Sequence, residues 1–441
     1  MNQPHPEVAS PSGSCSRGRG RAWLAWSMPA IFFLYEFLIR VSPGVIIGDL
    51  ETRFRTDSAD MGFDMSLYYY AYAPMQLVVG LLLDRFGGKI PLAIAAVICG
   101  AGCLVFAVAG GVTGLGAARF LMGFGSAFAY VGTVFVASIW FPRDRLALLS
   151  GLTAALGMLG AISAEALLGR VLAVMTWREA FDLFAAFALI LAVLMWFMVP
   201  RNPRWHVQQV ERDRLVHGGG VLSSLMIVIR SRQTWLLAIV TGLLYLPVGT
   251  FAALWGNDYL QTVMGFAAGE SGIAVALIFV GIAVSGPVLG WYSDRRGRRA
   301  RYLKVGTVVA FAASVGVLVI PEPPRLMVFP LLMLIGVGGG SIVLAFPLAM
   351  EHSPAHCRGS AMTFVNFIQM IMTGIGQWVV GILLSSMDEG TSGPSSAHAF
   401  RVAFLILPGS LLVGILLAQV LRDPDSAGEP PSAASGLPLG D

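Results

Sequence analysis

The chain has 441 residues, of which 56% are hydrophobic and only 12% charged, and its formal net charge is +4. Ordinary soluble domains carry about 25% charged residues, so this composition excludes a soluble fold. Most apolar runs reach the roughly 20 residues that cross about 30 Å of hydrocarbon as a helix. The sequence therefore predicts an all-α membrane protein.

The apolar runs predict two halves of six transmembrane helices each. The first six span about 22–47, 65–86, 89–111, 114–140, 145–169 and 177–199, and the last six about 234–258, 270–293, 301–320, 326–350, 359–386 and 400–421. The predicted segments are a cytosolic tail at 1–21, a six-helix bundle at 22–199, a cytosolic linker at 200–233, a second bundle at 234–421 and a disordered tail at 422–441.

Two features of these polar segments follow from composition. The last segment is rich in Pro, Ser, Gly and Ala, so we expect it to lack a fold. The linker contains VLSSLMIVIR at 221–230, which either forms an amphipathic helix along the membrane surface or is plain linker.

The distribution of basic residues in short loops predicts the orientation. With the N-terminus inside, the opposite side receives few arginines, namely Arg53, Arg55, Arg170, Arg178, Arg325 and Arg401. Near the first two of these lie the acidic residues Asp49, Glu51, Asp57, Asp60 and Asp64. We therefore expect both termini in the cytoplasm.

Two patterns in the chain are typical of soluble enzymes, but the residues around them argue against both. His352, His356 and Cys357 have metal-like spacing, but Pro354 breaks the helix that would align them. The glycines of 336–340 lie in an apolar run without a preceding strand, so we expect packing rather than phosphate binding. No basic and aromatic surface suggests nucleic acid. We expect no metal, no cofactor, no nucleic-acid partner and no enzyme activity.

One ten-residue stretch occurs twice. GLLLDRFGGK begins at Gly80, and GWYSDRRGRR begins at Gly290. The shared residues Gly80, Asp84, Arg85 and Gly87 recur at one constant offset as Gly290, Asp294, Arg295 and Gly297. Both aspartates stand at predicted helix C-termini, where the macrodipole disfavours a carboxylate by roughly 0.3–1 kcal/mol. Each aspartate therefore needs a partner elsewhere.

This repeated pattern resembles the signature of the major facilitator superfamily of secondary transporters, and the likeness covers essentially the whole chain. The resemblance implies twelve transmembrane helices in two pseudo-symmetric six-helix bundles that work by alternating access. By pseudo-symmetry, Asp84 is expected to reach Arg358 at the start of the eleventh helix. Asp294 is expected to reach Arg143 and Arg145 before the fifth helix. Such contacts would hold the cytosolic side closed.

Charges inside a bilayer cost roughly 2.5–3.5 kcal/mol each, so the retained ones are functional candidates. Here they are Glu36, Arg40, Arg119 and Glu165. Glu36 and Arg40 are four residues apart and share a helix face. In one interpretation Glu36 takes up a proton or meets a cationic group, while Arg40 binds a carboxylate or phosphate of the solute. In the other, they form a permanent intrahelical pair.

The remaining two charges are interpreted through the resemblance. Arg119 opens RFLMGFG, which is similar to the superfamily's fourth-helix motif and implies a role in coupling to, or stabilising, a protonatable partner. In the fifth helix, Gly151 and Gly160 match the antiporter pattern, but Ala164 and Glu165 replace its Gly-Pro. That departure argues against a drug/proton exporter. Glu165 is a second candidate for proton coupling, paired with one of the two arginines.

Polar and aromatic side chains complete the candidate solute site. Tyr69, Tyr72 and Gln76 step along one face of the second helix, whereas Tyr68 and Tyr70 are expected to be interfacial anchors. The candidates are Tyr35, Tyr69, Tyr72, Gln76, Tyr245, Trp255, Asn257 and Asn366. Buried amides need partners, which a solute or a neighbouring helix could supply.

We therefore expect a secondary active transporter that moves a small polar or charged solute with protons. The segments YEFLIRVSPG, YYYAYAPMQ, LWGNDYLQ and EHSPAHCRGSAMTFVN further resemble a bacterial branch related to lysosomal dipeptide carriers, which implies the bacterial inner membrane. A dipeptide would suit Glu36 and Arg40, and a small organic anion moved with a proton would suit Arg40 and Arg119. The alternatives are a dipeptide uniporter and a non-transporting receptor or scaffold on the same fold. The expected partners are the solute, H+ and the lipid bilayer, with the protein a monomer.

Overall fold

The computed structural model describes residues 17–142, 145–200, 221–320, 323–354, 357–387 and 395–423. Most of the predicted N-terminal tail, the linker from 201 to 220 and the C-terminal tail from 424 lie outside the described residues. Arg143, one of the expected latch residues, also lies outside them.

The first half of the chain is a series of helices that follows the predicted spans. They are α1 (Arg17–Val41), the 3₁₀ turn η1 (Ser42–Val45), α2 (Ile47–Phe54), α3 (Ser58–Phe86), α4 (Lys89–Val108), α5 (Val112–Ser126), α6 (Phe128–Trp140), α7 (Leu146–Val171) and α8 (Trp177–Met198). The predicted fourth span is divided at Ala127 into α5 and α6. The second span begins earlier than predicted because Asp57 caps it, accepting a hydrogen bond from the Asp60 amide.

The second half repeats this build. Its elements are α10 (Val221–Ile229), α11 (Arg232–Leu246), the π-helical η3 (Pro247–Trp255), α12 (Gly256–Met264), α13 (Ala268–Arg296), α14 (Arg299–Leu318), α15 (Arg325–Gly339), the 3₁₀ turn η4 (Gly340–Leu344), α16 (Ala345–Glu351), α17 (Arg358–Met387), α18 (Ala397–Ala403) and α19 (Ile406–Ala418). The linker segment at 221–230 is thus mostly helical, as one of its two interpretations required.

Eleven helical segments among the described residues are long and apolar enough to cross a membrane, where the sequence predicted twelve. The remaining one is α3, whose 29 residues suffice in length. Its tyrosines at 68, 69, 70 and 72, with Pro74 and Gln76, reduce its apolar character. Nevertheless α3 packs against α5 and α17 within the bundle. The predicted all-α membrane fold is confirmed, and its most polar span lies in the interior.

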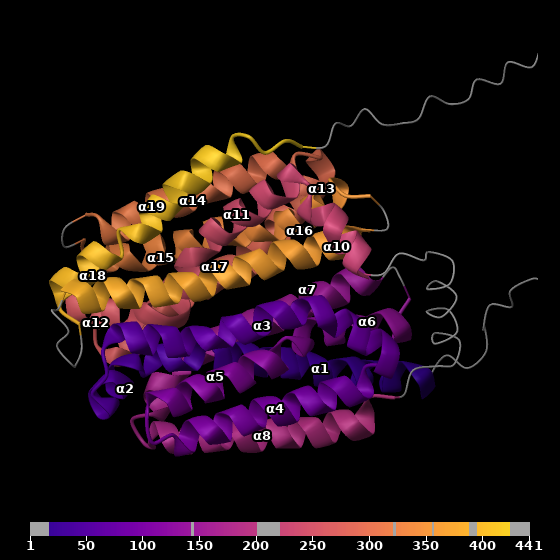
Figure 1. Cartoon of the computed structure of the whole chain (residues 1–441), viewed down its shortest axis with the longest axis horizontal. Coiled ribbons are helices and arrows are strands. Elements are labelled where there is room, and N and C mark those ends of the chain that lie inside the picture. Colours follow the sequence, from indigo (N-terminus) through magenta and orange to yellow (C-terminus); the bar gives the residue numbers. More distant parts are fainter. Residues whose placement is uncertain are drawn as a thin grey trace, which may run out of the picture.

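The two halves lie one above the other in Figure 1, with α1 to α8 in indigo to magenta and α10 to α19 in pink to yellow. Within the halves, α1 packs on α7, α4 on α8, α13 on α15 and α11 on α17. Between the halves, α3 packs on α17 and α7 packs on α13. These two helix pairs form the main contact between the halves.

At one end of the molecule the two halves touch through their backbones. A Cβ atom added at Gly381 of α17 would lie 2.2 Å from the Ser58 carbonyl oxygen, and one at Gly272 of α13 would lie 2.2 Å from the Glu165 carbonyl oxygen. Only glycine permits such an approach. The Ser58 hydroxyl also bonds to that of Ser395, with 3.0 Å between their oxygens. This end is closed.

At the opposite end, which carries the two repeated motifs, the described glycines make no such close backbone approach. Cβ atoms added at Gly80, Gly290 or Gly359 would meet nothing within 4 Å. None of the four ion pairs found between described residues joins the two halves. The sequence predicts that the arginine-rich end lies in the cytosol, and with that predicted orientation the structure corresponds to an inward-facing state.

The aspartate of the second motif has a different partner from the one expected. Asp294 Oδ1 lies 2.6 Å from Arg299 Nη2, within the same half, and Arg299 also pairs with Glu351. The expected contact of Asp294 with Arg145 is therefore not formed in this conformation. A latch requires the cytosolic ends to meet, so the contacts of Asp84 and Asp294 with the opposite half stay predictions for the outward-facing state.

A cysteine pair tests which end is closed. Ser58→Cys combined with Ser395→Cys should form a disulfide under mild oxidation without added ligand, because the two hydroxyl oxygens lie 3.0 Å apart. The bond would be detected by gel mobility and by mass spectrometry of the linked peptides. The control pair Gly80→Cys and Gly359→Cys should remain reduced. Efficient cross-linking of the control pair would contradict the inward-facing assignment.

Candidate functional site

A buried ion pair on α1 is the centre of the candidate site. Glu36 Oε1 accepts from Arg40 Nη2, and it also accepts a 2.6 Å hydrogen bond from the Tyr68 hydroxyl of α3. Arg40 Nε in turn donates to the Tyr68 hydroxyl oxygen at 3.4 Å. Glu36 is 0% exposed and Arg40 3% exposed. The pair is thus neutralised internally and tied to a second helix, as a buried charge requires.

An aromatic shell surrounds the guanidinium group of Arg40. Its Cζ atom lies 4.5 Å from the ring centroid of Phe37, 4.9 Å from that of Tyr72 and 5.5 Å from that of Tyr68. Cation–π attraction from these rings favours the charged form. Tyr245 of α11 interacts electrostatically with Arg40 from the second half. The cluster therefore lies where the two halves face each other.

Arg119 of α5 is bound to backbone carbonyl groups. Its Nη1 and Nη2 donate to the carbonyl oxygens of Ile39 and Arg40 at 3.1 and 3.2 Å, and its Nε donates to that of Met65 at 3.4 Å. Ile39 would normally bond to the amide four residues later, but that residue is Pro43, which has no N–H. Arg119 supplies the missing donor and so fixes the end of α1. The structure gives it a positioning role.

Glu165 does not pair with either arginine, contrary to the sequence prediction. Asn257 Nδ2, on α12 in the second half, donates to Glu165 Oε2 at 2.6 Å. The same nitrogen lies 3.5 Å from the Gly44 carbonyl oxygen. Arg119 and Arg40 are engaged elsewhere, as described above. Glu165 and Asn257 therefore belong to the closed end of the interface, separate from the charge cluster.

Three predicted site residues are turned toward other partners. The Tyr35 hydroxyl lies 3.2 Å from Cys103 Sγ of α4. Gln76 Nε2 donates to the Ala127 carbonyl oxygen at 3.2 Å, where α5 ends. Trp255 Nε1 donates to a backbone carbonyl of α17 at 3.2 Å. These contacts stabilise the bundles and the closed end.

Two other predicted residues keep side chains available near the interface. The Tyr69 hydroxyl is buried and bonds to no group in the part of the chain that the structure describes. Asn366 lies half-buried on α17. One turn further along the same helix, Gln369 has a buried Oε1 that is also unsatisfied among the described residues. Buried polar atoms of this kind are the groups that a polar solute would satisfy.

Tyr68 is the functional residue that sequence reasoning missed. It was expected to be an interfacial anchor, yet it is fully buried and donates to Glu36. Its spacing carried a usable signal, because Tyr68 and Tyr72 are four residues apart and share a helix face.

These features define a multi-pass membrane protein of two helical halves with a buried charge cluster where the halves face each other. A family model described as Major Facilitator Superfamily matches residues 30–377. The chain belongs to this superfamily of transporters, as the repeated motif predicted.

Relatives and solved structures agree with this assignment. A Cupriavidus necator protein named "Probable sulfoacetate transporter" is 24% identical over 385 residues, covering 86% of this chain and 84% of the relative. The hexuronate transporter of Escherichia coli is 24% identical over 419 residues, covering 90% and 94%. In fold, the chain resembles a bacterial homologue of the human lysosomal transporter Spinster in its inward-facing, unoccupied conformation, with a TM-score of 0.74, 14% identity, and coverage of 94% of this chain and 100% of the other. None of these three names concerns peptides.

The positioning role of Arg119 predicts a loss of stability on a conservative change. Arg119→Lys keeps the charge but cannot reproduce the fork that reaches Ile39 and Arg40, and each lost charged hydrogen bond costs about 1.5–3 kcal/mol. The melting temperature in detergent should fall clearly. The exposed Arg170→Lys serves as the matched control and should leave it unchanged. Equal melting temperatures for wild type and Arg119→Lys would show that these carbonyl contacts are dispensable.

Proposed function

We propose that this protein is a secondary active transporter that moves a small organic anion together with a proton by alternating access. The observation that carries the proposal is the buried pair of Glu36 and Arg40, held by Tyr68 where the two halves face each other. A transporter of anions needs a fixed cation at its solute site, and Arg40 supplies one with the planar geometry that carboxylates match.

Charge balance explains why the proton would accompany the anion. While Glu36 is ionised, it satisfies Arg40, and a solute carboxylate would place two negative charges beside one guanidinium in a buried site. Such an uncompensated charge is strongly unfavourable. Protonation of Glu36 releases Arg40, which then binds the solute anion, so the net charge of the cluster is the same with both the proton and the anion bound as with neither. This exchange of partners is a mechanism for symport.

The arrangement of the halves suggests how binding is linked to movement. Glu36, Arg40 and Tyr68 belong to the first half, whereas Tyr245 approaches Arg40 from the second. An anion on Arg40 would therefore contact both halves. In the inward-facing conformation the outer end is closed by glycine contacts, and closure of the cytosolic end would bring the two repeated motifs against the opposite half. Alternation between these states exposes one site to each side in turn.

The names of the relatives support the choice of solute. Hexuronate and sulfoacetate are both small organic anions, and the corresponding transporters match the chain along most of its length. The peptide alternative has less support, because it requires Glu36 to bind an ammonium group while Arg40 binds a carboxylate. In the structure these two side chains bind each other.

We further propose that the protein works as a monomer in a bacterial inner membrane with both termini in the cytoplasm. The arginine distribution supports this orientation, and the reported relatives are bacterial.

The role of Glu36 can be tested in proteoliposomes that contain a pH dye. The panel of solutes would comprise D-glucuronate, other sugar acids, sulfoacetate and dipeptides. Wild type should accumulate an organic anion under an inward proton gradient and move protons with it. Glu36→Gln should lose gradient-driven accumulation but retain exchange of the solute, because a neutral amide mimics the protonated acid. The control is Glu270→Gln, a half-buried carboxylate outside the charge cluster, and it should behave as wild type.

The companion variant Arg40→Gln should lose both activities, by at least about 100-fold, because the solute carboxylate would then be buried without a cation. Proton-driven accumulation by Glu36→Gln at the wild-type level would contradict the coupling mechanism. If the protein transported dipeptides but no organic anion, the proposed solute class would be wrong and dipeptides would take its place.

A further inference from the structure

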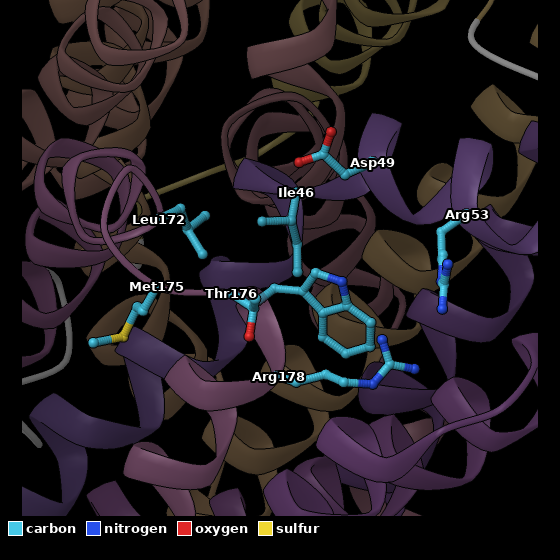
Figure 2. A pocket seen from close by; sticks show the side chains of 8 residues that line it. Ile46, Asp49, Arg53, Leu172, Met175, Thr176 and Arg178 are labelled. Carbon is cyan, nitrogen blue, oxygen red and sulfur yellow. The ribbon is translucent and has the colours of Figure 1, made fainter.

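A pocket of about 400 Å³ lies on the closed, outer end of the first half. It is formed by two segments, 46–53 around the start of α2 and 172–178 between α7 and α8. Figure 2 shows that Arg53 enters from one side and Arg178 from below. Trp177 also lines the pocket. Neither the charge cluster nor its proposed mechanism uses this pocket.

Two guanidinium groups give the pocket its positive charge. Arg178 is half-buried, lies 4.2 Å from the ring centroid of Trp177 and donates from Nη2 to the Ala109 carbonyl oxygen at 2.8 Å. These contacts hold it in place. Arg53 is exposed, and no side chain in the part of the chain that the structure describes forms an ion pair with it.

Among the described residues, no acidic side chain close to the pocket forms an ion pair with these arginines. Asp49 lines the pocket, but its carboxylate points away from both guanidinium groups in Figure 2. Glu179 is bound to the amide and hydroxyl groups of Thr176 in a capping box. Burial and the nearby Asp258 raise the pKa of Glu51 to about 8, so this carboxyl group of α2 is mostly neutral at pH 7.

We propose that this pocket is an outer docking site for the transported organic anion, in which Arg53 and Arg178 bind its carboxylate and Trp177 contacts its carbon skeleton. The inference rests on the proposed function, since it assigns a second site to the same solute. Two guanidinium groups beside an aromatic ring match a small carboxylate with a short carbon chain. A docked anion would be concentrated at the outer surface, which raises the rate of its entry.

The position of the pocket suits docking in both conformations. All its lining residues belong to the first half, so the site stays intact when the halves separate. The pocket also adjoins the contact between η1 and η3 at the closed end, because Ile46 of the pocket directly follows η1. In η1, a Cβ at Gly44 would lie 2.9 Å from backbone atoms of Ala253 and Leu254 in η3. When this contact opens, an anion leaving the pocket enters beside the end of α1, which carries Arg40.

The test separates binding at the outer side from the later steps. Uptake into right-side-out vesicles and into inside-out vesicles would be measured with D-glucuronate and sulfoacetate as probes. Arg53→Gln should raise the KM at the outer side by about 3- to 10-fold with unchanged kcat, and should leave the KM at the cytosolic side as in wild type. Arg53→Glu should raise the KM at the outer side further, and Arg53→Lys should restore the wild-type value. The effect should shrink at high salt, because screening weakens exposed charges.

Arg55→Gln is the matched control, since it removes the same charge two residues away but outside the pocket. It should leave both KM values unchanged. An unchanged outer KM in Arg53→Gln, or an equal rise in the control, would overturn the docking site while leaving the proposed function intact. If wild type transports neither probe nor any other organic anion, the proposed function fails and the docking site fails with it.

Discussion

The need to satisfy charge inside a membrane governs this structure. The described part of the chain meets that need in three ways: Glu36 and Arg40 neutralise each other, Arg119 is surrounded by carbonyl oxygens, and Glu165 is bound by an amide from the opposite half. Only the first solution is an ion pair between two charged side chains, each of which can change its partner. The same constraint thus separates a group suited to binding and proton transfer from groups that hold the helices in place.

A single proline connects the backbone to the site. Pro43 ends α1 and leaves the Ile39 carbonyl without an amide donor, so the chain must supply another. Arg119 does so from α5, and its second bond goes to the carbonyl of Arg40 itself. The backbone at Arg40, the candidate solute-binding residue, is therefore held by Arg119, for which the sequence suggested a coupling role. In the structure the contacts of Arg119 fix the position of the end of α1.

The sequence predicted most of the fold because apolar runs of membrane length leave few alternatives. From a spacing of four residues it placed Glu36 and Arg40 on one helix face, and their ion pair was one of the two interpretations left open. What it could not predict depends on packing between distant segments. The partner of Glu165 is 92 residues away and lies in the other half. Tyr68 was judged by its residue type, and only the packing of α3 against α5 and α17 shows that it is buried. The pocket of Arg53 and Arg178 likewise joins segments far apart in the chain.

The two halves have similar folds but unequal chemistry. Among the described residues, the buried charged side chains are Glu36, Arg40, Glu51, Arg119 and Glu165, all in the first half. The second half meets two of them with neutral groups, Tyr245 at Arg40 and Asn257 at Glu165, whereas Glu51 has the acidic Asp258 nearby. A neutral partner can separate from a charged site without leaving a new uncompensated charge behind. The asymmetry therefore fits the proposed alternating access, in which the first half keeps the ions while the second half moves.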